Sequence, residues 1–92
     1  MGQDKKKTMN IGVVTRRLRK AKGMTQEELA LASNLDRSYY GEIERGEKTP
    51  SLPTTFKIAY GLKMEPEDLV KEIKESGVFY NLFDDEDYHE EE

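Results

Sequence analysis

The residues with the clearest chemistry lie close together in the segment DRSYYGEIERG, residues 36–46. If this segment is a helix with Ile43 at the centre of its buried side, helical periodicity places Arg37, Ser38, Gly41 and Arg45 on the opposite side. Arginine can donate two hydrogen bonds to one guanine, serine can bond a base or a phosphate, and glycine allows close backbone approach. This side of the predicted helix therefore has the chemistry to read bases in a DNA major groove.

The acidic residues of the same segment have other expected roles. Asp36 is predicted to be the N-cap of the helix. Glu44 falls on a flank of the helix, where a neighbouring helix can reach it. Glu42 falls at the edge of the outward side, where it could accept from a cytosine amino group or repel a wrongly placed phosphate, and the sequence does not decide between these roles.

The two adjacent tyrosines of this helix cannot both point into the core. We expect Tyr40 to be a core residue and Tyr39 to be partly exposed, with its hydroxyl available to a phosphate. Further phosphate contacts are expected from Gln26, from Lys48 and Thr49 in the following loop, and from basic residues of the segment 16–22.

Helical periodicity and capping signals predict an all-α domain of five helices, with no competing strand pattern. Thr25 and Glu28 form a capping box at the start of the second helix, and Ser51 is the predicted cap of the fourth. The second and third helices are separated by three or four residues, the spacing of a helix-turn-helix. The expected helices are residues 11–22, 26–33, 37–45, 52–62 and 66–76.

The apolar residues at helical spacing mark the expected packing faces of the other helices. In the first helix they alternate with basic residues, which makes that helix amphipathic. The last apolar turn, residues 78–83, is expected to dock on the domain or on a partner. The expected apolar faces are Ile11, Val14, Leu18 and Ala21 in the first helix, Leu52, Phe56, Ala59 and Tyr60 in the fourth, and Leu69, Val70 and Ile73, facing inward, in the fifth.

Charge is distributed unevenly along the 92 residues, whose net formal charge is -4. Residues 1–50 hold 11 basic and 7 acidic side chains, whereas residues 51–92 hold 4 and 12. We therefore expect a basic flexible segment at 1–9, a mildly basic helix-turn-helix domain at 10–76, and an aromatic and then acidic tail at 77–92. The asymmetry points to nucleic acid as the partner of the basic part.

Several classes of protein are disfavoured by composition. Without cysteine there is no disulfide framework, no thiolate nucleophile and no cysteine-based zinc site. No enclosed pair of nucleophile and base is indicated, so we expect neither an enzyme nor a cofactor. His89 lies among acids in the tail and suggests only weak, adventitious metal binding. No apolar run approaches a membrane span, so a cytoplasmic location is expected.

The stretch TQEELALASNLDRSYYGEIERG, preceded by LRKAKGM and followed by EKTPSL, resembles the helix-turn-helix family of phage Cro and CI repressors and xenobiotic-response-element regulators. The resemblance covers about residues 11–73. The segment SNLDRSY is also similar to the controller proteins of restriction-modification systems. The residues at the family's apolar positions are Leu29, Ala30, Leu35, Tyr40 and Ile43.

The resemblance implies roles for individual residues. Gln26, at the start of the second helix, would hold the DNA backbone, and Arg37 and Ser38 would read bases, supported by Tyr39 and Lys48. It also implies an ion pair between the ends of the first and third helices, here Arg19 and Glu44.

This sequence departs from the family pattern at two positions. Thr15 replaces a usual aliphatic residue, so the core there is expected to rely on Val14. Asn34 replaces a turn glycine, which is a mild change because asparagine tolerates the left-handed conformation.

These expectations combine into a sequence-specific transcriptional regulator, by default a repressor, that binds a palindromic operator on double-stranded DNA as a homodimer. The fourth and fifth helices and residues 78–83 are the candidate dimer surface. One alternative is an antitoxin-like module whose main partner is a protein held by the tail. Another is a nonspecific or coactivator-type DNA adaptor. The acidic tail itself would act as a solubilising end, a DNA mimic or a handle for a partner protein.

Overall fold

The computed structural model describes residues 9–83, and within this range the secondary structure consists of helices joined by turns and loops. The predicted all-α architecture of five helices is confirmed. A short 3-10 helix, η1, follows them. The elements are α1 (Ile11–Ala21), α2 (Gln26–Ala32), α3 (Arg37–Glu44), α4 (Leu52–Gly61), α5 (Pro66–Ser76) and η1 (Val78–Leu82). The expectations for the acidic tail, for His89 and for all but the last residue of the basic segment 1–9 lie outside the described residues.

Local hydrogen bonds fix the helix ends as the sequence predicts. At the start of α2, the Thr25 hydroxyl accepts from the Glu28 N–H at 3.0 Å while the Glu28 carboxylate accepts from the Thr25 N–H at 2.8 Å. The carboxylate of Asp36 caps α3 by accepting from the Tyr39 N–H, and the Ser51 hydroxyl caps α4. These bonds satisfy N–H groups that have no partner within their own helix.

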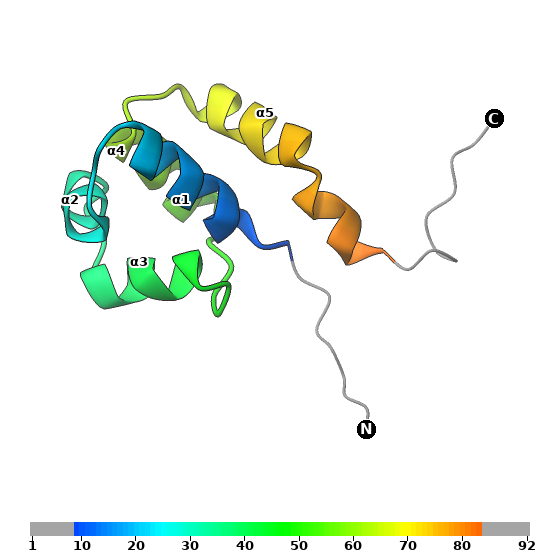
Figure 1. The fold of residues 1–92 in the computed structure, drawn as a ribbon, viewed down its shortest axis with the longest axis horizontal. Coiled ribbons are helices and arrows are strands. Elements are labelled where there is room, and N and C mark those ends of the chain that lie inside the picture. The colour runs from blue at the N-terminus through cyan, green and yellow to red at the C-terminus, as the bar shows by residue number, and fades with distance from the viewer. Residues whose placement is uncertain (1–8, 84–92) are drawn as a thin grey trace.

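The helices pack around one core, with α3 and α5 on opposite sides of the domain (Figure 1). α1 lies in the middle of the view and packs against α3 on one side and α5 on the other. α2 contacts both α3 and α4, and α4 also contacts α5. As a result α3 lies along one edge of the domain, and α5 with η1 lies along the opposite edge.

The core draws on every α-helix. Thr15 and Val14 are both buried, so the threonine does not shift packing onto its neighbour as expected but shares the core with it. The Thr15 hydroxyl is bonded to the carbonyl of Gly12, which makes its burial tolerable. The buried apolar residues are Ile11, Val14, Leu29, Ala30, Tyr40, Ile43, Ile58, Ala59, Leu62, Leu69 and Ile73.

Three expectations about packing faces are wrong. Ala21 is exposed because α1 ends there, beyond the reach of α3 and α5. Val70 was expected to face inward but is 46% exposed. In α4 only Ala59 of the predicted stripe is buried; Leu52, Phe56 and Tyr60 form an exposed apolar row, while Thr55, Ile58 and Gly61 face α2 and the core.

Residues 78–83 fold back as η1 and contact α5, and Val78 packs against the core. Gly77 joins the two elements in the left-handed conformation, with φ of 81°, which glycine adopts without strain. No helix within residues 9–83 has the length and apolar character needed to cross a membrane.

Candidate DNA-reading surface

The turn between α2 and α3 brings the two helices together at a fixed angle. Asn34 occupies the left-handed region at φ of 58°, as expected for the residue that replaces a turn glycine. A hydrogen bond holds the next residue close to the end of α2, since the Leu35 N–H donates to the Ala30 carbonyl at 2.8 Å. The chain can therefore start α3 at Arg37 immediately after a tight turn.

Backbone contact between α1 and α3 sets the position of α3. A methyl group on Gly12 of α1 would lie 1.9 Å from the Ile43 carbonyl oxygen and 2.6 Å from the Glu44 Cα. Such distances are too short for any side chain, so α3 lies directly on the backbone of α1. Nothing in the sequence singles out Gly12, because a glycine inside a helix gives no sign of what packs against it.

Arg19 and Glu44, the pair implied by the family resemblance, lie together between α1 and α3. The Arg19 Nε donates to one carboxylate oxygen of Glu44 at 2.6 Å, and Nη2 donates to the other at 3.0 Å. Their side chains are only 9% and 2% exposed. The Arg19 Nη1 also donates to the Met24 carbonyl at 2.7 Å, so the guanidinium joins α1, the following loop and α3.

Two more donors complete this buried cluster. The Tyr40 hydroxyl donates to the Glu44 carboxylate, and the Gln26 amide nitrogen donates to it at 2.9 Å. The Tyr40 and Thr15 hydroxyl oxygens are 3.1 Å apart. The Glu44 carboxylate therefore receives bonds from α1, α2 and α3, and this satisfies a charge that would be costly to bury alone.

The pKa values of the cluster follow from burial and these bonds. Burial by itself would raise the pKa of Glu44, but the hydrogen bonds from Arg19, Tyr40 and Gln26 outweigh it and lower that pKa below its ordinary value. Burial and the bond to Glu44 raise the pKa of Tyr40. The bond to Glu44 raises the pKa of Arg19. The cluster thus holds an ionised carboxylate and a neutral phenol.

The opposite side of α3 carries a shallow polar depression of about 360 Å³. Five of the eight predicted DNA-binding residues line it, together with the unassigned Glu42. Gly41 faces the depression but is buried, because the side chains of Arg45 and Gln26 lie over it. The lining residues are Gln26, Arg37, Ser38, Gly41, Glu42 and Arg45.

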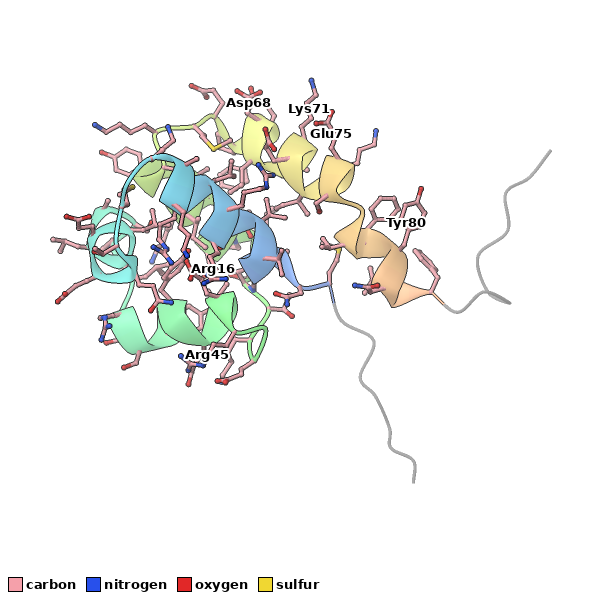
Figure 2. The ribbon with its side chains drawn as sticks, in the orientation of Figure 1. Arg16, Arg45, Asp68, Lys71, Glu75 and Tyr80 are labelled. Carbon is pink, nitrogen blue, oxygen red and sulfur yellow. The ribbon has the colours of Figure 1, made fainter. Side chains whose placement is uncertain are left out.

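Arg45 projects from the end of α3 on the side away from α1 (Figure 2). Its Nε donates to one carboxylate oxygen of Glu47 at 2.8 Å, and its Nη2 donates to the other at 3.2 Å. The bond from Arg45 lowers the pKa of Glu47. This pairing was not predicted: Glu47 lies beyond the end of the helix, where helical spacing does not indicate a contact.

The other three predicted DNA-binding residues do not line the depression. Tyr39 is half-buried and packs against the core, whereas Lys48 and Thr49 are exposed in the loop after α3. In α1, Arg19 is buried, and the exposed Arg17 donates to Glu72 of α5 at 2.9 Å. Both of these basic side chains are therefore engaged within the domain.

The edge formed by α5 has a different character. Asp68, Lys71 and Glu75 project from α5 on the side away from α1, so acidic and basic groups are mixed there (Figure 2). Within residues 9–83 no group of three or more potential metal ligands comes together.

A tight α2–turn–α3 unit with a polar, arginine-bearing outer face defines the helix-turn-helix class. The chain belongs to the helix-turn-helix family, whose model matches residues 16–69. It is 37% identical over 82 residues to the immunity repressor protein of Bacillus phage phi105, covering 86% of this chain but only 57% of that protein's length. It is 40% identical over 60 residues to control protein C.BamHI of Bacillus amyloliquefaciens, covering 64% of this chain and 74% of that protein.

Solved structures of restriction-modification controller proteins have the same fold. C.AhdI from Aeromonas hydrophila is 48% identical, with a TM-score of 0.62, over 66% of this chain and 92% of that chain. Wild-type C.Esp1396I is 33% identical, with a TM-score of 0.67, over 73% of this chain and 86% of that chain. The predicted kinship with repressors and controller proteins is thereby confirmed.

Proposed function

We propose that the chain is a transcriptional regulator that binds specific sites on double-stranded DNA. The observation that carries the proposal is the polar depression on the outer face of α3. Its lining includes Arg37, Ser38 and Arg45 from α3 and its end, and Gln26 from α2. These groups offer donors that match base edges in a major groove, and no described element covers this edge of the domain (Figure 1). The names of its relatives, an immunity repressor and control proteins, agree with such a role.

Within this proposal the residues divide into two groups. Arg37 and Ser38, at the start of α3, read bases together with Arg45. Tyr39, Lys48 and Thr49 hold phosphates at the border of the reading surface, and the side chain of Gln26 holds the backbone from α2. Contacts of the second group fix the register of the domain on the duplex but carry no sequence information.

We further propose that the regulator acts as a homodimer on a palindromic operator in the cytoplasm and represses by occluding a promoter. A single domain of this size makes too few contacts for strong specificity. Two exposed apolar surfaces are available for pairing. One is the α4 row of Leu52, Phe56 and Tyr60; the other surrounds an almost wholly apolar depression of about 330 Å³ lined by Met9, Val70, Ile73, Lys74 and Phe79.

Charge substitutions distinguish these two surfaces. Val70→Glu and Tyr60→Glu each place a carboxylate on one surface without entering the core, since both residues are exposed. Sedimentation equilibrium should show that one variant is monomeric and the other dimeric, with unchanged helicity in both. A monomeric parent chain would overturn the homodimer.

Base reading is tested by Arg37→Ala on duplexes selected from a random pool. Loss of a bidentate arginine contact is expected to reduce discrimination at one base pair by about 5- to 100-fold. Lys57→Ala is the matched control, because it removes an exposed cation from α4, away from the depression. If Arg37→Ala weakened binding equally on selected and random duplexes, base reading by Arg37 would be wrong.

For the chain as a whole, we propose the division suggested by its charge: a basic segment at 1–9, a DNA-binding domain at 10–76, and a tail from 77. η1 supports a boundary near Gly77, because α5 ends there in a left-handed residue and the 3-10 helix that follows packs against α5.

A further inference from the structure

Glu47, in the loop directly after α3, holds the side chain of Arg45 by both of its carboxylate oxygens. The two side chains are 57% and 53% exposed, so the pair is not part of the core. Exposed ion pairs add little to stability, because water screens them and two long side chains lose rotational freedom. The consequence of this pair is therefore geometric: it fixes the direction of one guanidinium at the edge of the reading surface.

The bonded atoms determine which donors are left. Arginine carries five N–H groups. Glu47 accepts from Nε and from Nη2, and the Nη1 edge of the guanidinium lies over Gly41, where a methyl group would be 3.2 Å from Nη1. The donors on Nη1, and the second donor on Nη2, are then on the edge of the guanidinium that faces away from Glu47.

That outer edge, formed by Nη1 and Nη2, can act as a bidentate hydrogen-bond donor. Two parallel N–H groups of one guanidinium match the O6 and N7 acceptors of guanine in the major groove. Gly41 lets the guanidinium lie this close to the helix, because a methyl group there would push it away by a few tenths of an ångström. The depression that contains Arg37 and Ser38 is directly adjacent, so the same base-pair steps are within reach.

We propose that Glu47 is a positioning residue that orients Arg45 across Gly41 so that Arg45 reads one guanine in each half-site. The inference rests on the proposed function and adds to it a residue and a base type. Glu47 has a second effect: its charge opposes nearby phosphates and lowers affinity for DNA of any sequence. Only the positioning effect increases the ratio of specific to nonspecific binding, because the charge effect lowers both affinities alike.

The test uses the full chain and a duplex selected by that chain from a random pool. Affinities of Glu47→Gln, Arg45→Ala and the double variant are measured on this duplex, on its single-base substitutions and on random DNA. Glu27→Gln is the control, since it removes an exposed carboxylate from the first turn of α2 while the Arg45–Glu47 bonds remain. Arg45→Ala is expected to lose about 5-fold or more of its preference at one guanine.

The positioning role predicts that Glu47→Gln loses much of the preference at that same guanine and gains affinity for random DNA. In the double variant, Glu47→Gln should have no additional effect on base preference, because the group that it positions is gone. Glu27→Gln should keep the preference at this guanine. Equal strengthening on every duplex by Glu47→Gln would reduce Glu47 to a charge effect and overturn the inference. A parent chain that selects no site would instead overturn the proposed function, and the inference with it.

Discussion

Two arginine–glutamate pairs meet at the end of α3, and they differ in almost everything except chemistry. Glu44 bonds Arg19 in a site where both side chains are at most 9% exposed, whereas its neighbour Arg45 bonds Glu47 with both side chains more than half exposed. The first pair links three helices and fixes the position of α3. The second pair fixes only a side chain on the surface of α3. Adjacent residues thus separate the support of α3 from its proposed contact with DNA.

Burial, more than the type of pair, determines how much an ion pair contributes to the stability of the fold. A buried carboxylate with one partner removed keeps its desolvation cost, while an exposed carboxylate is solvated by water instead. Substitutions in the two pairs should therefore change different measurements: unfolding for the first and base preference for the second.

The largest effect is expected for Glu44→Gln. The buried guanidinium of Arg19 would lose its counter-charge, and this should lower the free energy of unfolding by about 3–5 kcal/mol. Chemical denaturation of the variant and the parent at neutral pH measures the difference. If Glu44→Gln were as stable as the parent, the cluster would not support α3.

Gly12→Ala tests the same support through the backbone instead of through charge. The added methyl group would collide with the Ile43 carbonyl, which cannot rotate away, and overpacking of this kind costs about 1–3 kcal/mol or more. Affinity for DNA should fall as well, because α3 must move. Gly23→Ala is a contrasting variant, because its methyl group would meet no atom within 4 Å and its cost comes only from the left-handed φ of 71°.

Acidic pH is expected to affect the two pairs differently, because Glu44, unlike Glu47, couples its charge to a buried network. Its pKa in the folded chain lies below the ordinary value of 4.5, so its contribution to stability is present above that pH and is lost as pH falls through the lower, folded value. Denaturation of the parent and of Glu44→Gln from neutral pH to about pH 3 should show that their stabilities converge. A constant difference across this range would contradict a depressed pKa.

The smallest effect on stability is expected for Glu47→Gln. Both partners of this pair are exposed, so the variant should unfold at the same denaturant concentration as the parent. The same denaturation experiment measures it, side by side with Glu44→Gln. A loss of stability as large as that of Glu44→Gln would erase the distinction between the two pairs.

The sequence predicted those features that depend on local chemistry. The Thr25–Glu28 box, the Asp36 cap and the Asn34 turn form between residues a few positions apart, so their signals are complete within a short segment. The burial of Tyr40 and Ile43 also followed from helical periodicity. For the reading surface, periodicity placed Arg37, Ser38 and Arg45 on one side of α3, where the structure also has them.

Features that depend on neighbouring helices were not predictable in this way. Val70 and Tyr60 have apolar side chains at helical spacing, but their exposure depends on which side of α4 and α5 the other helices cover. The closeness of α1 and α3 at Gly12 is a tertiary contact without a local signal. Glu47 reaches Arg45 only because the chain turns at Gly46, which has φ of 78°.

The most direct test of the central claim is selection of bound duplexes from a random DNA pool by the full chain. If the outer face of α3 reads bases, the pool should converge on an inverted repeat whose half-sites are about one helical turn apart, and Arg37→Ala should relax one position in each half-site. A pool that shows no enrichment after repeated rounds would contradict sequence-specific DNA binding by this chain.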